Sequence, residues 1–301
     1  MTERMEKGKK KWGWLKKLAC FFLLALLLAG GWVAYQVYSF TQDIYSQDYA
    51  GEDEVKSKPL EGTRLNVLFI GIDTYEQEGS RADVLMLLSL DTDTGEASML
   101  SIPRDTRVTL PGRGEDKINH AHAYGGIPIT VQAVESFLEL DVNYYARINM
   151  QGFKDLVEII GGVTIDVEPE VAQAEETLEP GVQHLDGSQS LEYVRERKVS
   201  GGDFARIERQ QKFMLALASQ TLKPANILKM PEFMDKLGAN FRTNIPLGQL
   251  TKLGYQVMRL DMDEVERDRV RGNEAIIGGV YYLIPDQLQV QEQLREMGIK
   301  E

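Results

Sequence analysis

The sequence contains very little cysteine and histidine. Its 301 residues include one cysteine, Cys20, and three histidines, which excludes an intramolecular disulfide framework and a cysteine-based zinc site. His120 and His122 are two residues apart, a weak indication of a metal site, and His184 is the third histidine. The chain also lacks the G-x-S-x-G, Walker A and G-x-G-x-x-G motifs, which argues against a serine hydrolase and a nucleotide-driven motor.

A net excess of positive charge is also missing. The formal net charge is −12, so a broad basic surface for nucleic acid is not expected. The charge is nevertheless divided unevenly along the chain. Residues 1–17 carry seven basic and two acidic side chains, a net charge of +5, which leaves −17 for the remaining residues. A short basic segment therefore precedes a strongly acidic remainder.

Charge is absent altogether from residues 18–38, a run of 21 mostly apolar residues. As a helix this run would be about 31 Å long, which matches the hydrocarbon core of a bilayer. A buried core helix is the alternative, but the length, the lack of charge and the flanking aromatic residues favour an uncleaved, single-pass signal anchor. The basic residues 1–17 would stay in the cytoplasm, and the rest would lie outside the cell membrane.

The exported part is expected to consist of a stalk and one domain. Residues 39–63 are polar and acidic, without apolar periodicity beyond Tyr49, and predict an extracellular stalk. Residues 64–295 predict the extracellular folded domain. Its first strands are expected at 65–71, 84–90 and 97–102, and residues 91–96 predict a hairpin turn between the second and the third.

Strands and helices alternate after this hairpin. Residues 128–140 and 153–160 have helical spacing, and residues 144–148 and 163–167 have the composition of strands. The alternation predicts an α/β fold, a single mixed β-sheet with helices on both faces. Residues 168–185 predict an acidic loop, 189–193 a short helix, and 204–222 a long helix capped by Asp203. Two or three further helices and an apolar stretch at 276–284 follow.

Two aspartates occur where strands end or begin. Asp73 follows the first strand, and Asp83 immediately precedes the second. Adjacent strands could bring their carboxylates together as ligands for Mg²⁺, which prefers oxygen ligands and keeps several waters. An aspartate after a strand is also a common turn former or helix cap, and for each residue alone that interpretation is the better one.

Arginines accumulate in loops and on one helix face despite the acidic net charge. They are Arg81, Arg104, Arg195, Arg197, Arg206 and Arg209. The planar arginine side chain donates two parallel hydrogen bonds to phosphate. Surface ion pairs with Glu196 and Glu208 are the alternative for any single arginine. Together, and beside two aspartates, the arginines favour an anionic, phosphorylated ligand.

Many of these residues lie in short motifs that follow one another along the chain. The motifs are Gly71-Ile72-Asp73, Arg81-Ala82-Asp83, Ser101-Ile102-Pro103-Arg104-Asp105-Thr106, Lys117-Ile118-Asn119-His120-Ala121, Asn149-Met150-Gln151-Gly152-Phe153, Gly161-Gly162-Val163, Leu185-Asp186-Gly187, Arg195-Glu196-Arg197 and Gly202-Asp203 through Gln211. Over about residues 64–220 the series resembles the LytR-CpsA-Psr family of Gram-positive cell-envelope proteins. The basic tail and the single anchor are also typical of that family.

The resemblance implies a phosphotransferase at the outer surface of the membrane. Members of the family transfer a glycopolymer (teichoic acid, capsule or another wall polysaccharide) from an undecaprenyl-pyrophosphate carrier to a hydroxyl of peptidoglycan. Undecaprenyl phosphate is released in the reaction. A hydrophobic tunnel between the sheet and the helices would take the polyprenyl chain.

The resemblance also implies roles for individual residues. Asp73 and Asp83 would hold Mg²⁺, with Mn²⁺ as the alternative. Arg104 would be catalytic, and either Asp73 or Asp105 would be the base for the incoming hydroxyl. Asp203 would orient the arginine cluster. The pyrophosphate would be bound by Arg81, Arg104, Arg195, Arg197, Arg206, Arg209 and Gln210.

Two other functions stay open on the sequence alone. Water could replace the peptidoglycan hydroxyl, which would make the protein a polyprenyl-pyrophosphate phosphatase. The protein could instead be a lipid-binding or regulatory envelope protein without catalysis, since members of the family have been labelled transcriptional attenuators. Seventeen residues next to a membrane span are a poor DNA-binding domain, and anchoring accounts for their charge better.

Overall fold

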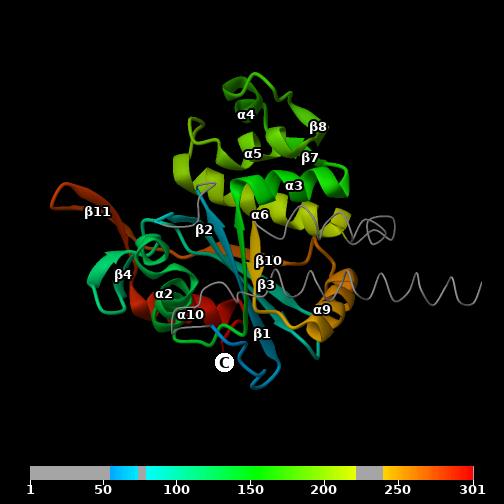
Figure 1. Ribbon diagram of the computed structural model, residues 1–301. Helices are drawn as coiled ribbons and strands as arrows, with labels where there is room; N and C mark the ends of the chain where they lie inside the picture. Colours follow the sequence, from blue (N-terminus) through cyan, green and yellow to red (C-terminus); the bar gives the residue numbers. More distant parts are fainter. Residues whose placement is uncertain (1–54, 74–78, 222–239, 301) are drawn as a thin grey trace, which may run out of the picture.

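A six-stranded sheet forms the centre of the domain (Figure 1). The computed structural model describes residues 55–73, 79–221 and 240–300. The strands of the central sheet are β1 (Arg64–Ile72), β2 (Ala82–Asp91), β3 (Ala97–Ser101), β6 (Tyr144–Asn149), β9 (Phe241–Thr243) and β10 (Glu266–Arg269). Their order in the sheet is β10-β3-β2-β1-β6-β9.

The sheet contains both antiparallel and parallel pairs. Strands β1, β2 and β3 are antiparallel neighbours, and the predicted turn at 91–96 is present, with Asp91 Oδ1 accepting backbone N–H hydrogen bonds from Asp93 and Thr94. Strand β6 runs parallel to β1, which requires the crossover made by helix α2 (His120–Leu138). Strand β10 is parallel to β3, and β9 is antiparallel to β6. The predicted mixed α/β fold is confirmed.

Helices cover both faces of this sheet (Figure 1). Besides α2, the described helices are α3 (Met150–Ile160), α4 (Pro169–Ala174), α5 (Gly187–Arg195), α6 (Gly202–Thr221), α9 (Leu247–Arg259) and α10 (Gln287–Glu296). Side chains alternate between the two faces of a strand. Ile70 of β1 therefore packs in the core with α2 and α10, whereas its neighbour Phe69 faces a cavity bordered by α3, α5 and α6.

Three two-stranded hairpins lie outside the central sheet. They are β4 (Arg107–Leu110) with β5 (Gly114–Lys117), β7 (Val163–Val167) with β8 (Gly181–Leu185), and β11 (Asn273–Ile277) with β12 (Val280–Ile284). The strand predicted at 163–167 is thus present but pairs with β8, and its strict alternation of buried and exposed residues suits a hairpin with one solvated face. Residues 168–185, expected to be a loop, contain α4 and β8.

Helix α2 begins eight residues earlier than the predicted helix at 128–140. Gly125 and Gly126 have non-helical backbone angles, and Pro128 lies inside the helix. The apolar periodicity therefore becomes regular only after this kink, which is why the sequence pattern misses the first turns.

The predicted basic tail at 1–17, the membrane span at 18–38 and most of the stalk lie outside the described residues. Within residues 55–73, 79–221 and 240–300, no helix has the length and apolar character needed to cross a membrane. Residues 55–63, the described end of the predicted stalk, lie against the domain. There the Lys58 backbone N–H donates to the Asn143 carbonyl at 3.2 Å, and the Lys58 ammonium is 2.7 Å from Glu135.

Candidate active site

One edge of the central sheet collects the charged residues that the sequence singles out. Asp73 directly follows β1, Asp83 is the second residue of β2, and Arg104 follows β3 after a short turn. Because β1, β2 and β3 are antiparallel, the end of β1, the start of β2 and the end of β3 fall at the same edge. The topology therefore brings together three residues that are up to 31 positions apart in the chain.

Arg104 lies among three carboxylates. Its Nη1 is 3.1 Å from Asp83 Oδ1, its Nε is 3.6 Å from Asp105 Oδ2, and its Nη2 is 3.8 Å from Asp203 Oδ1. Burial opposes the charged form of this guanidinium, but Asp83, Asp203 and Asp105 together raise the pKa of Arg104 above its ordinary value. Arg104 is therefore a fixed, permanently charged group at the edge of the sheet.

Asp203 connects Arg104 to helix α6. The sequence predicts Asp203 as the cap of a helix beginning at 204, but α6 starts at Gly202, and the Asp203 side chain instead pairs with Arg206, one turn on, at 2.9 Å. Burial lowers the pKa of Arg206, and the positive charges of Arg104 and Arg197 lower it further. Several guanidinium groups thus crowd together here, an arrangement that an anion would stabilise.

An apolar cavity of about 260 Å³ opens beside this arginine cluster. Its wall consists mainly of apolar side chains from β1, β2, β6, α3, α5 and α6, for example Met86, Ile148, Phe153, Phe213 and Leu217. The polar residues that line it belong mostly to the predicted site: Asp73, Asp83, Arg195, Arg197, Arg206 and Gln210. The cavity therefore suits an amphipathic ligand with an anionic head and a long apolar tail.

The remaining predicted residues lie around this cavity without lining it. Arg81 is exposed, and its backbone N–H donates to Asp73 Oδ1 at 3.2 Å. Arg209 is buried and donates to the backbone carbonyl of Glu196, between the two arginines of the Arg195-Glu196-Arg197 segment. Arg209 is thus placed to position this segment from behind.

Asp105 is another of the carboxylates beside Arg104. Its Oδ1 accepts a hydrogen bond from Lys117 Nζ at 2.6 Å, and it does not line the cavity. Lys117 is present in one of the motifs, but its pattern alone assigns it no role. The contact with Asp105 shows that Lys117 belongs to the charged network. This contact joins the end of β5 to the segment before β4, and the sequence spacing does not reveal it.

The donor set at the cavity fits a small, hard cation. Among the described residues there is no group of three or more histidine, cysteine or acidic side chains that could hold a metal, but Asp73 and Asp83 line the same cavity. Mg²⁺ typically uses one or two carboxylates together with substrate phosphates and water. The two histidines at 120 and 122 do not converge: His120 pairs with Asp116 at 2.9 Å, and His122 Nδ1 bonds to the Ser80 carbonyl.

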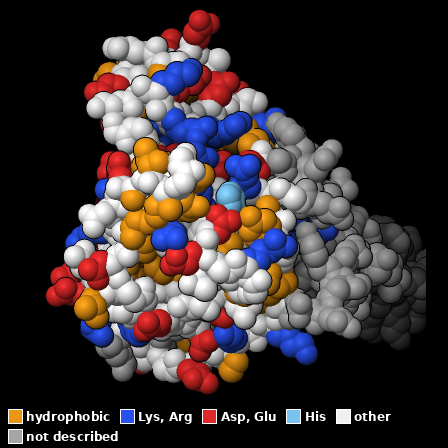
Figure 2. Space-filling view, turned by 90° about the vertical axis from the view of Figure 1, so that its left-hand side faces the viewer, with side chains coloured by type: hydrophobic (Ala, Val, Ile, Leu, Met, Phe, Trp, Pro, Cys, Tyr) orange, Lys and Arg blue, Asp and Glu red, His pale blue; other side chains and the backbone are white. Residues whose placement is uncertain are grey.

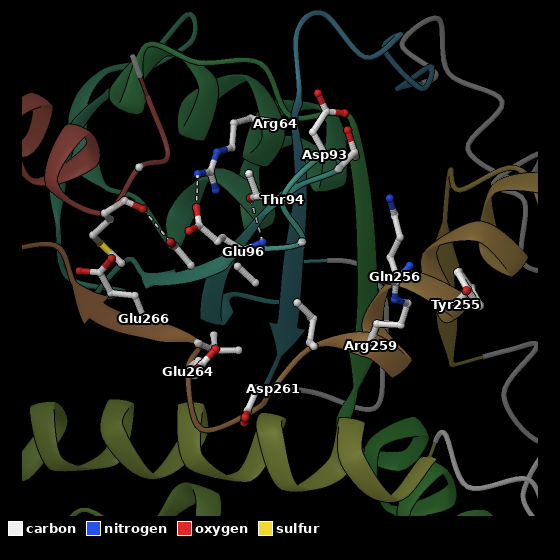
Figure 3. Close-up of a pocket in the computed structure, with 18 of the residues that line it drawn as sticks. Arg64, Asp93, Thr94, Glu96, Tyr255, Gln256, Arg259, Asp261, Glu264 and Glu266 are labelled. Atoms are coloured by element: carbon white, nitrogen blue, oxygen red, sulfur yellow. Dashed lines mark hydrogen bonds and ion pairs between the residues drawn. The ribbon is translucent and has the colours of Figure 1, made fainter.

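A second and wider hollow, of about 590 Å³, lies at the opposite edge of the sheet (Figure 3). Six acidic residues line it, against the two arginines Arg64 and Arg259. Arg64 is itself neutralised, because it lies 3.5 Å from Asp91 and 3.9 Å from Glu96. This hollow is therefore unsuited to a phosphorylated ligand, in contrast to the cavity beside Arg104.

Comparison with known proteins agrees with the motifs. A sequence model described as the LytR_cpsA_psr family matches residues 33–299. One similar protein, from Oceanobacillus iheyensis, is named polyisoprenyl-teichoic acid–peptidoglycan teichoic acid transferase TagU. The two sequences are 33% identical over an alignment 305 residues long, and the alignment covers 95% of this chain and 94% of that protein.

Solved structures give the same result for the fold. A structure described as TagT bound to LI-WTA has a TM-score of 0.69 and 31% sequence identity, and the match covers 83% of this chain and 97% of that one. A second structure, of the LytR-CPS2A-psr family protein YwtF (TagT) with bound octaprenyl pyrophosphate lipid, has a TM-score of 0.65 and 29% identity, and the match covers 83% and 97% of the two chains. The chain belongs to the LytR-CpsA-Psr family.

Proposed function

We propose that this protein is a membrane-anchored, extracellular phosphotransferase. It attaches a glycopolymer, such as teichoic acid or another wall polysaccharide, to peptidoglycan. The donor is the glycopolymer linked to undecaprenyl pyrophosphate, and undecaprenyl phosphate is the leaving group. The observation that supports this most directly is the joining of an arginine cluster and an apolar cavity in one site. The names of the TagU and TagT relatives agree with this donor and acceptor.

The arginines bind the pyrophosphate of the donor. Arg206, Arg195 and Arg197 line the cavity beside the apolar wall, so the polyprenyl chain enters the cavity while its pyrophosphate stays among the guanidinium groups. Arg104 neutralises the charge that develops on the phosphate oxygens during transfer, since it is held in place by Asp83 and Asp203. Gln210 donates to the Val194 carbonyl at 3.1 Å and so fixes α6 to α5 behind the arginines.

The transfer is a substitution at phosphorus. The hydroxyl oxygen of the acceptor forms a bond to the phosphorus that carries the glycopolymer, and the bond from that phosphorus to the bridging oxygen breaks. Undecaprenyl phosphate leaves with the electron pair of the broken bond, and the hydroxyl proton passes to a carboxylate base. Asp73 and Asp105 are the candidates for this base, one in the cavity wall and the other in contact with Arg104.

Asp73 and Asp83 are the residues that would hold Mg²⁺ or Mn²⁺. A bound cation would supply further neutralisation of the phosphate oxygens. Residues 18–38 would anchor the protein as a single-pass span, with its N-terminus in the cytoplasm and its catalytic domain outside the cell.

A transfer assay tests this function. The full-length protein is mixed with a polyprenyl-pyrophosphate-linked glycan and peptidoglycan oligomers. Covalent transfer that is lost in Arg104→Ala and in Asp83→Ala supports the proposal. Release of lipid phosphate without any need for an acceptor would indicate a phosphatase, and lipid binding without either product would indicate a binding or regulatory protein.

A further inference from the structure

The β11–β12 hairpin is an exposed apolar element that the reaction described above does not use. Ile276 is 74% exposed, Ile277 41%, Val280 43% and Tyr281 39%, and residues 275–284 contain no charged side chain. The hairpin projects from the body of the domain (Figure 1). On this side of the molecule, hydrophobic side chains gather into a patch directly below a cluster of Lys and Arg (Figure 2).

The base of the hairpin is fixed to the segment that carries Arg104. The Leu283 backbone N–H donates to the Asp105 carbonyl at 3.0 Å, and Leu283 pairs with Thr106 in a parallel bridge. Leu283 is only 1% exposed. The hairpin therefore starts at the active site and extends outward from it.

Two tyrosines, Tyr281 and Tyr282, lie between the turn of the hairpin and its base at Leu283. Partial burial raises the pKa of Tyr281, and the carboxylates of Glu274, Asp105 and Asp203 raise it further. Tyr282 is the next residue and points to the other side of the strand. Its ring centroid is 5.7 Å from the Lys117 ammonium.

In-line attack requires a surface for the acceptor outside the cavity that takes the lipid. In phosphoryl transfer the attacking and leaving oxygens are roughly in line with the phosphorus. The leaving polyprenyl phosphate occupies the cavity that Asp83 lines, whereas Asp105 contacts Arg104 without lining the cavity, and the backbone carbonyl of Asp105 is bonded to the hairpin. The acceptor therefore needs a surface outside the cavity, and the hairpin provides one that begins at Asp105, next to Arg104 in the chain.

We propose that the β11–β12 hairpin, with Ile276 and Tyr281 at its centre, is the binding surface for the acceptor glycan chain of peptidoglycan. This inference rests on the proposed function. Sugar rings present faces of C–H groups that pack well on flat aromatic and aliphatic side chains. An uncharged surface also suits the sugar backbone of the acceptor better than the polyanionic donor. Ile276 and Tyr281 are cross-strand partners, so they form one continuous contact area.

The test compares the full-length protein in detergent with the double variant Ile276→Ser/Tyr281→Ala. A matched control is Val182→Ser, because Val182 is 75% exposed on another hairpin, β7–β8. Two quantities are measured for each protein. One is the KM for peptidoglycan oligomers and for a polyprenyl-pyrophosphate donor. The other is direct binding of the oligomers without donor.

We expect the double variant to raise the acceptor KM and the oligomer Kd about tenfold. The donor KM stays unchanged, and Val182→Ser behaves as wild type. An unchanged oligomer Kd overturns the inference. So does an effect confined to the donor KM, or a loss of binding to phosphatidylglycerol vesicles with normal oligomer binding. If oligomers bind to the hairpin but no transfer occurs in wild type, the proposed function fails while the hairpin assignment stands.

Discussion

The carboxylate of Asp203 lies 2.9 Å from the guanidinium of Arg206, one turn further along α6. Its other oxygen faces Arg104 at 3.8 Å, so one acidic side chain orders two arginines from separate parts of the chain. Without it, like charges would repel across the site, because Arg104 already lowers the pKa of Arg206.

We therefore expect Asp203→Asn to reduce kcat/KM for transfer by about 10- to 100-fold, the range for the loss of a charged hydrogen bond. The affinity for the donor is expected to fall together with kcat/KM, since Arg206 lines the cavity. The control is Glu208→Gln, an exposed residue of the same helix. Equal kinetics for the two variants would contradict a positioning role for Asp203.

The rate of transfer is expected to fall even when Arg104 is replaced by lysine, the other basic side chain with a permanent charge at neutral pH. Its guanidinium contacts Asp83, Asp105 and Asp203 with three different nitrogens, and a lysine ammonium is a single point charge without the planar arrangement of donors. We predict that Arg104→Lys lowers kcat by about 100-fold or more, with Arg104→Ala at least as low. The exposed Arg113 provides the control as Arg113→Lys. Activity within a few-fold of wild type in Arg104→Lys would exclude a catalytic role for the arginine geometry.

The depth of the cavity predicts selectivity for the length of the lipid. Leu217 lies eleven residues after Arg206 on α6, about 16 Å further along the helix. The bulky side chain of Leu217→Trp would fill the far end of the cavity. Long polyprenyl pyrophosphates should therefore bind at least tenfold more weakly, while the affinity for short ones stays unchanged. Leu288→Trp, at an exposed position, should bind all lengths normally. Equal losses for short and long lipids would show that the chain does not extend along α6.

Divalent cation binding is expected to depend on the two aspartates of the cavity. Titration with Mn²⁺, followed by electron paramagnetic resonance, should show one site in wild type and at least tenfold weaker binding in Asp73→Asn and in Asp83→Asn. Asp141→Asn, at an exposed carboxylate, is the control. Transfer should also fall on chelation and return with Mg²⁺. Unchanged Mn²⁺ binding in both cavity variants would remove these residues from the metal site.

The buried histidine predicts a pH dependence of stability. Burial lowers the pKa of His122 below its ordinary value of 6.5, and the charge of Arg147 adds to this effect. Between the lowered pKa and 6.5 the unfolded chain binds a proton that the folded chain does not, so the free energy of unfolding falls as pH falls below about 6.5. Above that pH both states are neutral at this residue, and the contribution is fully present.

Urea unfolding at pH 7.5, 6.5 and 5.5 measures this dependence. His122→Asn keeps a donor for the Ser80 carbonyl but cannot be protonated, so its stability should decrease less steeply with falling pH than that of wild type. His184→Asn, at an exposed position of β8, should follow the wild-type curve. Parallel curves for wild type and His122→Asn would show that His122 does not contribute.

The sequence predicts the first half of the sheet because its strands are apolar and bounded by turn residues. The runs at 65–71, 84–90 and 97–102 correspond to β1, β2 and β3. Strands β9 and β10 have no such pattern. Strand β10 has the sequence Glu266-Arg267-Asp268-Arg269 and is an outermost strand of the sheet. Its pairing with β3 is determined by tertiary contacts, which periodicity does not report.

The site is predictable in its residue types but not in its connections. The charges and their positions at strand ends predict a site for a phosphorylated ligand, and the structure places Asp73, Asp83, Arg195, Arg197 and Arg206 in one cavity wall. The contact of Arg209 with the Glu196 carbonyl depends on how α6 packs against α5, and no sequence spacing encodes it. The exposure of residues 276–281 in the apolar stretch 276–284 is equally unpredictable from the sequence, because a short apolar run is more commonly buried.

Transfer in water enriched in ¹⁸O tests the central claim most directly. The full-length protein is incubated with the lipid-linked glycan and peptidoglycan oligomers, and the masses of the products are measured by mass spectrometry. If the acceptor hydroxyl attacks phosphorus, the glycan becomes bonded to peptidoglycan through an unlabelled phosphodiester, with one polyprenyl phosphate released for each bond formed. Incorporation of ¹⁸O into a released phosphate, with peptidoglycan left unmodified, would contradict the assignment as a glycopolymer transferase.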